Sequence, residues 1–324
     1  MAGYNEIRGL RVKYLSADPA NPENGQVWYN STTGNLRVEG ILGAGTWSSG
    51  TSFPVSFTAG SGGGTKTAGW STSGDQGSAV FLYDGSSWTG TGALNTARNG
   101  GASAGTQTAG LVFAGSTSPA PSPSGRNSIT EEFNGSVWAE QNDMNQTRDT
   151  LGGLGTQTAA LGFGGFISGP WPTGSTNAVE EYDGSSWTAV TALPGPAGKS
   201  MIKGAGIQTA AITAGGGPSN TNVATEYDGS SWTAASNFPT TTANLSTGGT
   251  QTDALCNGDG GTGTQSVAYN GTTWTAGSPF ATGRNNSASL GYATTQMAMV
   301  GGSPTTAVTE EFTIPVGTAT VSVS

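Results

Sequence analysis

Two short strings recur along the chain at nearly even spacing, and this repetition limits the possible folds more than any other feature. Copies of the first string, YDGSSWT or a close variant, occupy residues 83–89, 133–139, 182–188, 227–233 and 269–275. Copies of the second, GTQTA or a close variant, occupy residues 64–68, 105–109, 155–159, 206–210, 249–254 and 293–298. Equivalent residues of successive copies lie 41 to 51 residues apart. A period of about 40–50 residues is typical of a repeat made of four β-strands.

The unit at 98–142 illustrates how one repeat forms four strands. Residues 100–105 are small, as an inner strand near a crowded axis requires, and residues 109–115 form a short apolar run. Residues 129–133 alternate between apolar and polar, as a half-exposed strand does. The Asn-Gly pair at 134–135 predicts a two-residue type I′ turn before the fourth strand. Six such units predict an all-β, six-bladed β-propeller.

The order of features within the units resembles the kelch repeat. A basic residue opens the first strand, a glycine pair closes the second, and a Glu-aromatic step precedes the turn and the Trp. The basic residues are Arg98, Arg148, Lys199 and Arg284, the glycine pairs lie at 164–165, 215–216 and 301–302, and the acidic residues are Glu132, Glu181, Glu226 and Glu311. Leu82 and Ala268 replace the Glu in two units, and Asn257 replaces a glycine. The resemblance covers residues 47–314 and implies a kelch-type propeller.

Each unit is expected to bury one Trp, because glycine and alanine supply little apolar surface. These core residues are Trp47, Trp88, Trp138, Trp187, Trp232 and Trp274. The last unit has no Trp of its own, whereas Trp47 precedes the first unit. We therefore expect the strand around Trp47 to complete the blade of residues 292–314 and to close the ring, which removes an open sheet edge. The alternating segment 318–324 is the alternative occupant of that position.

This organisation divides the chain into an N-terminal arm and hairpin (1–46), the propeller (47–314) and a strand-like tail (315–324). In the arm, residues 18–38 read DPANPENGQVWYNSTTGNLRV, with strand-like residues on both sides of turn chemistry. This hairpin resembles a segment of the virion proteins of tailed bacteriophages, marine ones especially. The resemblance implies a virion protein, assembled in the host cytoplasm.

Upstream of the hairpin, residues 7–15 form a basic, β-prone stretch that contains Arg8, Arg11 and Lys13. The stretch has no obvious partner strand within the hairpin, and unpaired strands tend to pair with other edges. We expect residues 1–17 to dock on a neighbouring subunit. A disordered leader is the alternative.

Charge and composition exclude several classes of function. The net charge of −9 disfavours nucleic acid and anionic membrane as partners, because both require basic patches. No apolar run approaches the 18 or so residues that span a bilayer, and the first ten residues lack the apolar core of a signal peptide. The chain has no histidine, the commonest metal ligand and general base. We expect no metal, no cofactor and no enzymatic activity.

The remaining reactive groups have structural interpretations. The absence of histidine rules out the copper radical oxidases found among kelch-like propellers, and the repeated Asp of YDGSSWT is expected in a turn, at a spacing that differs from the Asp-box of sialidases. The adjacent pairs Glu131/Glu132 and Glu180/Glu181 would point to opposite strand faces, so neither pair can act on one bond. We expect the Glu of each Glu-aromatic step to pair with the basic residue of its blade; a ring of cation-binding carboxylates is the alternative. Cys256 is expected in the core rather than as a nucleophile.

The loops between second and third strands are the best candidates for binding, because they vary in length while the turns at the opposite end stay short. The two longest are 116–128, which contains Arg126, and the loop that contains Pro170, Trp171 and Pro172. Trp171 lies outside the periodic Trp series. We expect it to stack on a sugar or to anchor a protein partner, with packing over its own blade as the alternative.

Together these features predict a non-enzymatic structural protein of a phage virion, serving as a capsid decoration, tail fibre or adhesion module. Its propeller loops would bind a host-surface carbohydrate or another virion protein, and self-association would increase avidity. A pure assembly protein with no host ligand is the first alternative. A glycan-active hydrolase is the second and less favoured one.

Overall fold

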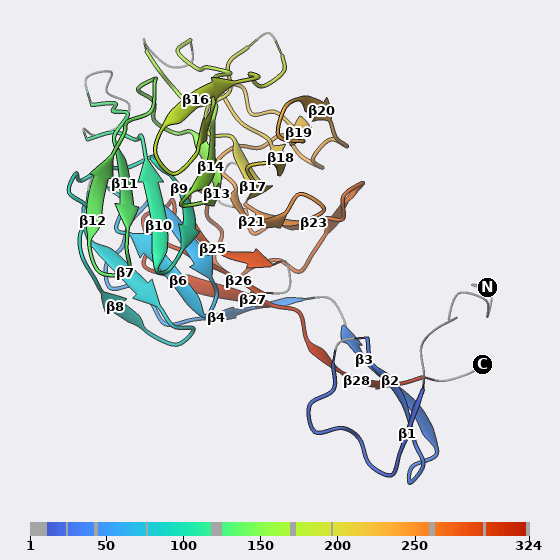
Figure 1. Cartoon of the computed structure of the whole chain (residues 1–324). Helices are drawn as coiled ribbons and strands as arrows, with labels where there is room; N and C mark the ends of the chain where they lie inside the picture. Colours follow the sequence, from blue (N-terminus) through green and yellow to red (C-terminus); the bar gives the residue numbers. More distant parts are fainter. Residues whose placement is uncertain are drawn as a thin grey trace. The chain divides into compact units, whose positions relative to one another are not determined.

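The structure, a computed structural model, describes residues 12–23, 25–41, 45–75, 77–117, 125–168, 173–195, 197–258, 263–293 and 296–321. These residues form β-strands and connecting turns (Figure 1). No helix long and apolar enough to cross a membrane occurs among them. The chain divides into two compact units, one formed by Met1–Gly45 with Ile314–Ser324 and the other by Thr46–Thr313.

The smaller unit is a single sheet that combines the N-terminal and C-terminal segments of the chain. Its strand order is β1 (Lys13–Leu15), β2 (Val27–Asn30), β3 (Asn35–Ile41) and β28 (Val316–Thr320). Strands β2 and β3 are antiparallel. Strand β28 pairs with the other edge of β3, so the described part of the strand-like tail at 315–324 completes this sheet. Trp28 is fully buried in the unit.

Strand β1 has a partner inside the hairpin, contrary to expectation. It pairs in parallel with β2, with Lys13 opposite Trp28. Parallel pairing needs a longer connection than a hairpin turn. Asp18 lies in that connection and accepts hydrogen bonds from Trp28 Nε1 at 2.9 Å and Asn30 Nδ2 at 2.8 Å. The prediction of an unpaired strand is therefore wrong for Lys13–Leu15, while residues 1–11 lie outside the described residues.

The larger unit contains six four-stranded sheets, one for each repeat. From inner to outer strand, the first three are β5 (Gly62–Thr65), β6 (Ala68–Thr72), β7 (Val80–Tyr83), β8 (Trp88–Gly90); β9 (Ala102–Thr106), β10 (Ala109–Phe113), β11 (Thr130–Phe133), β12 (Trp138–Gln141); and β13 (Gly152–Thr156), β14 (Ala159–Phe163), β15 (Val179–Tyr182), β16 (Trp187–Val190). The next three are β17 (Lys203–Ile207), β18 (Ala210–Ala214), β19 (Ala224–Tyr227), β20 (Trp232–Ala234); β21 (Ser246–Thr250), β22 (Asp253–Asn257), β23 (Ser266–Tyr269), β24 (Trp274–Ala276); and β25 (Ala288–Ala293), β26 (Gln296–Val300), β27 (Thr309–Thr313), β4 (Thr46–Ser49).

Strand β4 precedes the first repeat in the sequence but forms the outer edge of the last sheet. Trp47 lies opposite Phe312 in this antiparallel pair, as the missing Trp of the last unit predicts. The alternative occupant, residues 318–324, does not take this place in its described part, because β28 pairs with β3. The structure thus has seven four-stranded sheets rather than six. The additional sheet forms because the hairpin and the tail pair with each other.

The inner strands of consecutive sheets lie side by side in the larger unit (Figure 1). Contacts run from β5 to β9, β13, β17, β21 and β25 in turn, and β25 also contacts β5. Their residues are mostly Gly, Ala, Ser and Thr, and such small side chains allow the strands to approach closely.

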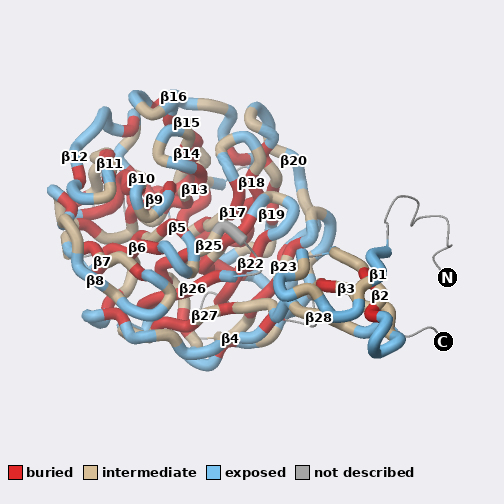
Figure 2. The backbone as a smooth tube through the Cα atoms, turned by 60° about the horizontal axis from the view of Figure 1, so that its bottom comes forward, coloured by how far each residue is buried: buried red, intermediate tan, exposed pale blue. Residues whose placement is uncertain are grey.

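Apolar side chains are buried between neighbouring sheets. Phe113 of one sheet packs with Leu151 and Trp187 of the next. The first and last sheets share such a cluster as well, with Tyr83 packed against Leu290. Figure 2 shows the buried residues along the strands and the exposed ones mainly at the turns. Each sheet is therefore covered by its neighbours rather than by a separate layer.

The six predicted core Trp residues share one local geometry. Each packs on the aromatic residue directly opposite it, with ring centroids 4.5–5.2 Å apart. Only Trp138 and Trp187 are buried, whereas the other four remain partly exposed. Trp70, which is outside the periodic series, is fully buried and packs on Trp138.

The turn after the Glu-aromatic step differs from the expected two-residue turn. Phe133 lies opposite Trp138, so four residues form the loop. Gly135 has a φ of 94°, whereas Asn134 does not adopt a positive φ, which excludes a type I′ turn. Asn134 Oδ1 instead accepts hydrogen bonds from the N–H groups two and three residues later, at 3.0 and 3.1 Å. The side-chain acceptor shapes the turn.

We expect Trp187→Ala to destabilise the larger unit by about 3–5 kcal/mol, the usual cost of truncating a buried Trp. The ring of Trp187 lies 4.7 Å from Phe113 and 5.0 Å from Tyr182, and Nε1 donates to Thr130 Oγ1 at 2.9 Å. Urea-induced unfolding followed by circular dichroism measures the loss. Trp274→Ala, at a partly exposed position, is the control and should cost clearly less; equal costs would contradict the assignment.

Candidate functional site

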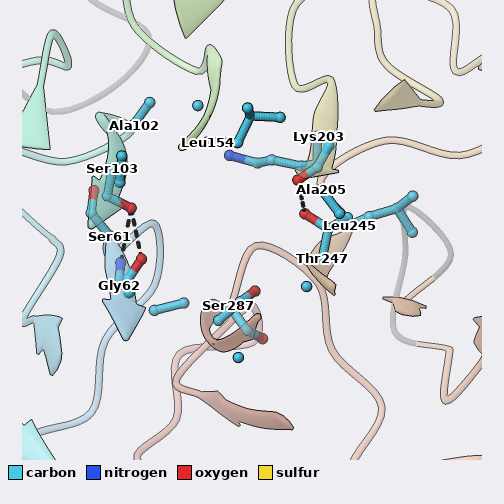
Figure 3. A pocket seen from close by; sticks show the side chains of 18 of the residues that line it. Ser61, Gly62, Ala102, Ser103, Leu154, Lys203, Ala205, Leu245, Thr247 and Ser287 are labelled. Atoms are coloured by element: carbon cyan, nitrogen blue, oxygen red, sulfur yellow. Dashed lines mark hydrogen bonds between the residues drawn. The ribbon is translucent and has the colours of Figure 1, made fainter. Parts of the chain in front are cut away.

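The inner strands of the six sheets surround one cavity of about 100 Å³ (Figure 3). Its lining is drawn from β5, β9, β13, β17, β21 and β25 and from the residues just before them. Most lining residues are glycine or alanine. The hydroxyl-bearing ones are Ser61, Ser103, Thr247, Ser287 and Ser289.

Lys203 is the only charged side chain among the described residues that line this cavity. Figure 3 shows its ammonium group extending from β17 into the open space. Nζ lies 3.4 Å from the carbonyl oxygen of Leu151, and the ion pairs of the described chain do not include it. Burial lowers the pKa of Lys203 to about 8, because desolvation disfavours the charged form.

A second set of polar groups links neighbouring sheets. The Glu of each Glu-aromatic step accepts a hydrogen bond from the tyrosine of the sheet beside it. The pairs are Glu132 with Tyr182 at 2.9 Å, Glu181 with Tyr227 at 2.8 Å, Glu226 with Tyr269 at 2.7 Å, and Glu311 with Tyr83. Burial, followed by the carboxylate contact, raises the pKa of each tyrosine, that of Tyr269 to about 12. Each tyrosine therefore stays a neutral donor.

The two sheets that lack this Glu depart from the pattern in a consistent way. Leu82 and Ala268 stand at the Glu position, and the neighbouring sheets then carry Phe133 and Phe312 in place of tyrosine. Phenylalanine has no hydroxyl, so no polar group is left without a partner. The same rule links the last repeat to the first. The pairing of Leu82 with Phe133, and of Ala268 with Phe312, can be read from the sequence, although it was not among the predictions.

The basic residues that open the repeats pair with a different carboxylate from the one expected. The pairs are Arg98 with Glu131, Arg148 with Glu180 at 2.6 Å, and Arg284 with Glu310 at 2.6 Å. The partner is thus the residue before the Glu of the Glu-aromatic step. Adjacent strand residues face opposite sides, so one carboxylate meets the Arg of its own sheet and the other meets the neighbouring tyrosine.

The other reactive groups also have structural roles. The side chains of Asp84, Asp183 and Asp228 accept hydrogen bonds from N–H groups in their exposed turns, which lowers their pKa, that of Asp183 to about 2. Cys256 is buried, and burial raises its pKa to about 12. Within the described ranges, no group of three or more His, Cys, Asp or Glu residues could hold a metal ion.

The structure places only some of the expected contact residues. Pro170, Trp171, Pro172, Arg8 and Arg11 lie outside the described residues. Lys13 is described and exposed. Arg126 is buried instead of lying on the loop surface: its Nε lies 3.2 Å from Asp149 Oδ2, and its guanidinium stacks over Phe166 at 4.4 Å. An ion pair and an aromatic ring thus hold Arg126 inside, which disqualifies it as a contact residue.

Comparison with known proteins supports the fold. No family model and no curated protein matches the chain. Among solved structures, that of YjhT is similar, with a TM-score of 0.65 and 16% sequence identity over 84% of this chain and 100% of that chain. At this identity the likeness shows the fold alone. With its repeated four-stranded sheets, the chain has an all-β fold of the β-propeller type.

We expect Tyr182→Phe and Glu132→Leu each to destabilise the protein by about 1 kcal/mol, because each leaves a part-buried polar partner unsatisfied. The double variant reproduces the Leu82–Phe133 combination found elsewhere in the same molecule. It should therefore cost less than the sum of the two single changes. Urea unfolding of the four proteins measures the coupling. Additive costs would show that the Tyr182–Glu132 contact contributes nothing.

Proposed function

We propose that this chain is a non-catalytic binding protein of a phage virion, with a closed, six-bladed kelch-type propeller as its rigid scaffold. The observation that most supports a non-catalytic role is that the carboxylates of the repeats already bind other side chains of the protein. Glu131 and Glu180 bind arginines, and Glu132 and Glu181 bind tyrosines. Acid–base catalysis by two carboxyl groups requires that both face one cleft in which the substrate binds. Carboxylates held in this way do not face such a cleft together.

Contacts between the last and first repeats support ring closure. Tyr83 of the first sheet donates to Glu311 of the last. Lys66 Nζ lies 2.7 Å from Thr313 Oγ1 and 3.3 Å from Glu311 Oε2. Strand β4 occupies the outer edge of the same sheet. The Tyr83–Glu311 contact is equivalent to the tyrosine–glutamate contacts between other neighbouring sheets, and a ring without an open end protects its edges from other chains.

The smaller unit supports the attachment role. It is a separate sheet joined to the propeller by two chain segments, and its hairpin resembles those of phage virion proteins. Its edge strand β1 pairs on one side only with β2 among the described strands. Val12 is 41% and Tyr14 is 77% exposed beside that edge. An open edge flanked by exposed apolar groups suits strand addition by another virion protein or a second copy.

The loop between β14 and β15 contains Trp171 and is the proposed contact with a host-surface carbohydrate. Antiparallel order places this loop and the connections between sheets at one end of the strands, and the short turns at the other. A Trp on such a loop can stack on a sugar face. Rigid blades position loops for recognition without taking part in the contact.

Deleting residues 1–17 should prevent incorporation into virions, because it removes strand β1. Particles produced with the tagged full-length or shortened chain are purified, and the tag is located by immunogold electron microscopy. Val137→Ser, at a 55% exposed turn position of the propeller, is the control and should be incorporated normally. Normal labelling of particles with the shortened chain would refute attachment through β1.

Binding to a glycan array should fall roughly 5- to 150-fold for Trp171→Ala relative to the unaltered protein, since stacking on an aromatic ring contributes roughly 1–3 kcal/mol. Val137→Ala is the matched control, because this exposed apolar side chain lies in a turn at the opposite end of the strands. Absence of binding by the unaltered protein would favour a pure assembly role. Release of sugar from a bound glycan would instead indicate a hydrolase.

A further inference from the structure

One position of the inner strands breaks the pattern of small residues around the cavity. The position that opens each inner strand, or directly precedes it in the first repeat, is small in five repeats: Ser61, Ala102, Gly152, Ser246 and Ala288. In β17 it is Lys203. Placing an ammonium group where the other repeats carry a methyl, a hydroxyl or a hydrogen has a desolvation cost. A lysine at this one position, among small residues at the equivalent positions, suggests that its charge has a function.

The lysine has no partner of opposite charge to offset that cost. Its contact in the cavity is the Leu151 carbonyl at 3.4 Å, at the long limit for a hydrogen bond. Lys199, in the same repeat, is also desolvated, which lowers its pKa, but it does not line the cavity. The described lining residues include no second titratable side chain. The charge of Lys203 therefore faces the cavity without a counter-ion among the described residues.

The hydroxyl groups around the cavity do not offset this charge. Those of Ser103 and Thr247 already donate to carbonyl oxygens at 2.8 and 2.6 Å. Ser287 Oγ is buried without a hydrogen-bond partner in the described structure, so a ligand in the cavity cannot reach it. Lys203 is therefore the group that a ligand of this cavity would meet.

We propose that this cavity binds a small oxyanion, a carboxylate or a phosphate, with the Lys203 ammonium as counter-charge. An ammonium group without an acidic partner among the described residues matches the charge and the acceptors of such a group. The cavity, of about 100 Å³, has room for an anion of this kind. The site is independent of the loop contacts proposed above.

The affinity of the cavity for an anion should decrease as the pH rises. Only the ammonium form supplies the counter-charge, and Lys203 without ligand has a pKa of about 8. A bound anion favours the protonated form and raises that pKa. For a carboxylate such as acetate, the affinity should be constant from about pH 6 to about pH 8, where the ligand stays fully ionised. It should decrease by about tenfold per pH unit above that, until the pKa of the complex is reached.

The test compares acetate, phosphate and acetamide as ligands of the full-length protein at pH 7 and constant ionic strength. Acetamide has nearly the shape of acetate without its charge. Either oxyanion, at about five times its Kd, should raise the melting temperature by roughly 2–4 °C, and acetamide should not. The effective anion identifies the ligand chemistry. No shift with either oxyanion, or an equal shift with acetamide, would overturn the proposal.

Lys203→Met should abolish the shift, because it removes the counter-charge while keeping most of the side-chain volume. Lys199→Met is the matched control and should bind as the unaltered protein does. In case Lys203→Met does not fold, NMR of the unaltered protein with ¹³Cε-labelled lysine follows the Lys203 titration directly. Its pKa should increase on addition of the active anion; an unchanged titration, or loss of binding in Lys199→Met, would refute the site.

Discussion

Burial of aromatic side chains between neighbouring sheets is the interaction on which the propeller depends. The sheets are rich in glycine and alanine, so a single sheet has too little apolar surface to be stable alone. Phe113 is buried only because Trp187 of the next sheet covers it, and Phe163 packs against Trp232 in the same way. Every sheet therefore needs its neighbours, and the stability of the unit belongs to the assembly of sheets.

Polar cross-links determine how each sheet is positioned on the next. The glutamine of the GTQTA-like strings donates to two backbone carbonyls of the preceding sheet: Gln107 Nε2, for example, lies 3.0 Å from the oxygens of both Gly69 and Tyr83. The tyrosine–glutamate hydrogen bonds add a second link between the same sheets. Hydrogen bonds have narrow geometric limits, so these links favour one relative position, whereas apolar contacts alone would tolerate several.

Most charged side chains of the repeats bind other groups of the same fold. This leaves few positions that could bind a ligand or a partner. The described arginines, the repeat glutamates and the turn aspartates all have partners within the fold, and the regular repeats are therefore scaffold. Departures from regularity are the more informative positions. Leu82 and Ala268 are compensated by phenylalanine in the next sheet, which makes them structural. No described residue offsets the charge of Lys203, and this difference separates a candidate binding residue from a tolerated variation in the repeat.

The sequence by itself determined the four-stranded repeat and the pairing of the Trp47 strand with the last repeat. Both follow from local periodicity, because turn residues and strand alternation recur at each copy. The sequence also predicted that adjacent glutamates point to opposite faces of the strand. It did not predict the partner of each glutamate, because the alternation of a strand says which face a side chain is on but not which element packs on that face.

Only the tertiary structure decided the burial of Trp70 and of the Arg126 side chain, the parallel partner of β1, and the convergence of the six inner strands on the cavity that Lys203 enters. The first and last of these strands, β5 and β25, begin 226 positions apart in a sequence of 324, and no local pattern connects them. Their proximity to a common space depends on how six sheets are arranged around it. That arrangement is set by long-range packing between the sheets, which short-range sequence patterns do not encode.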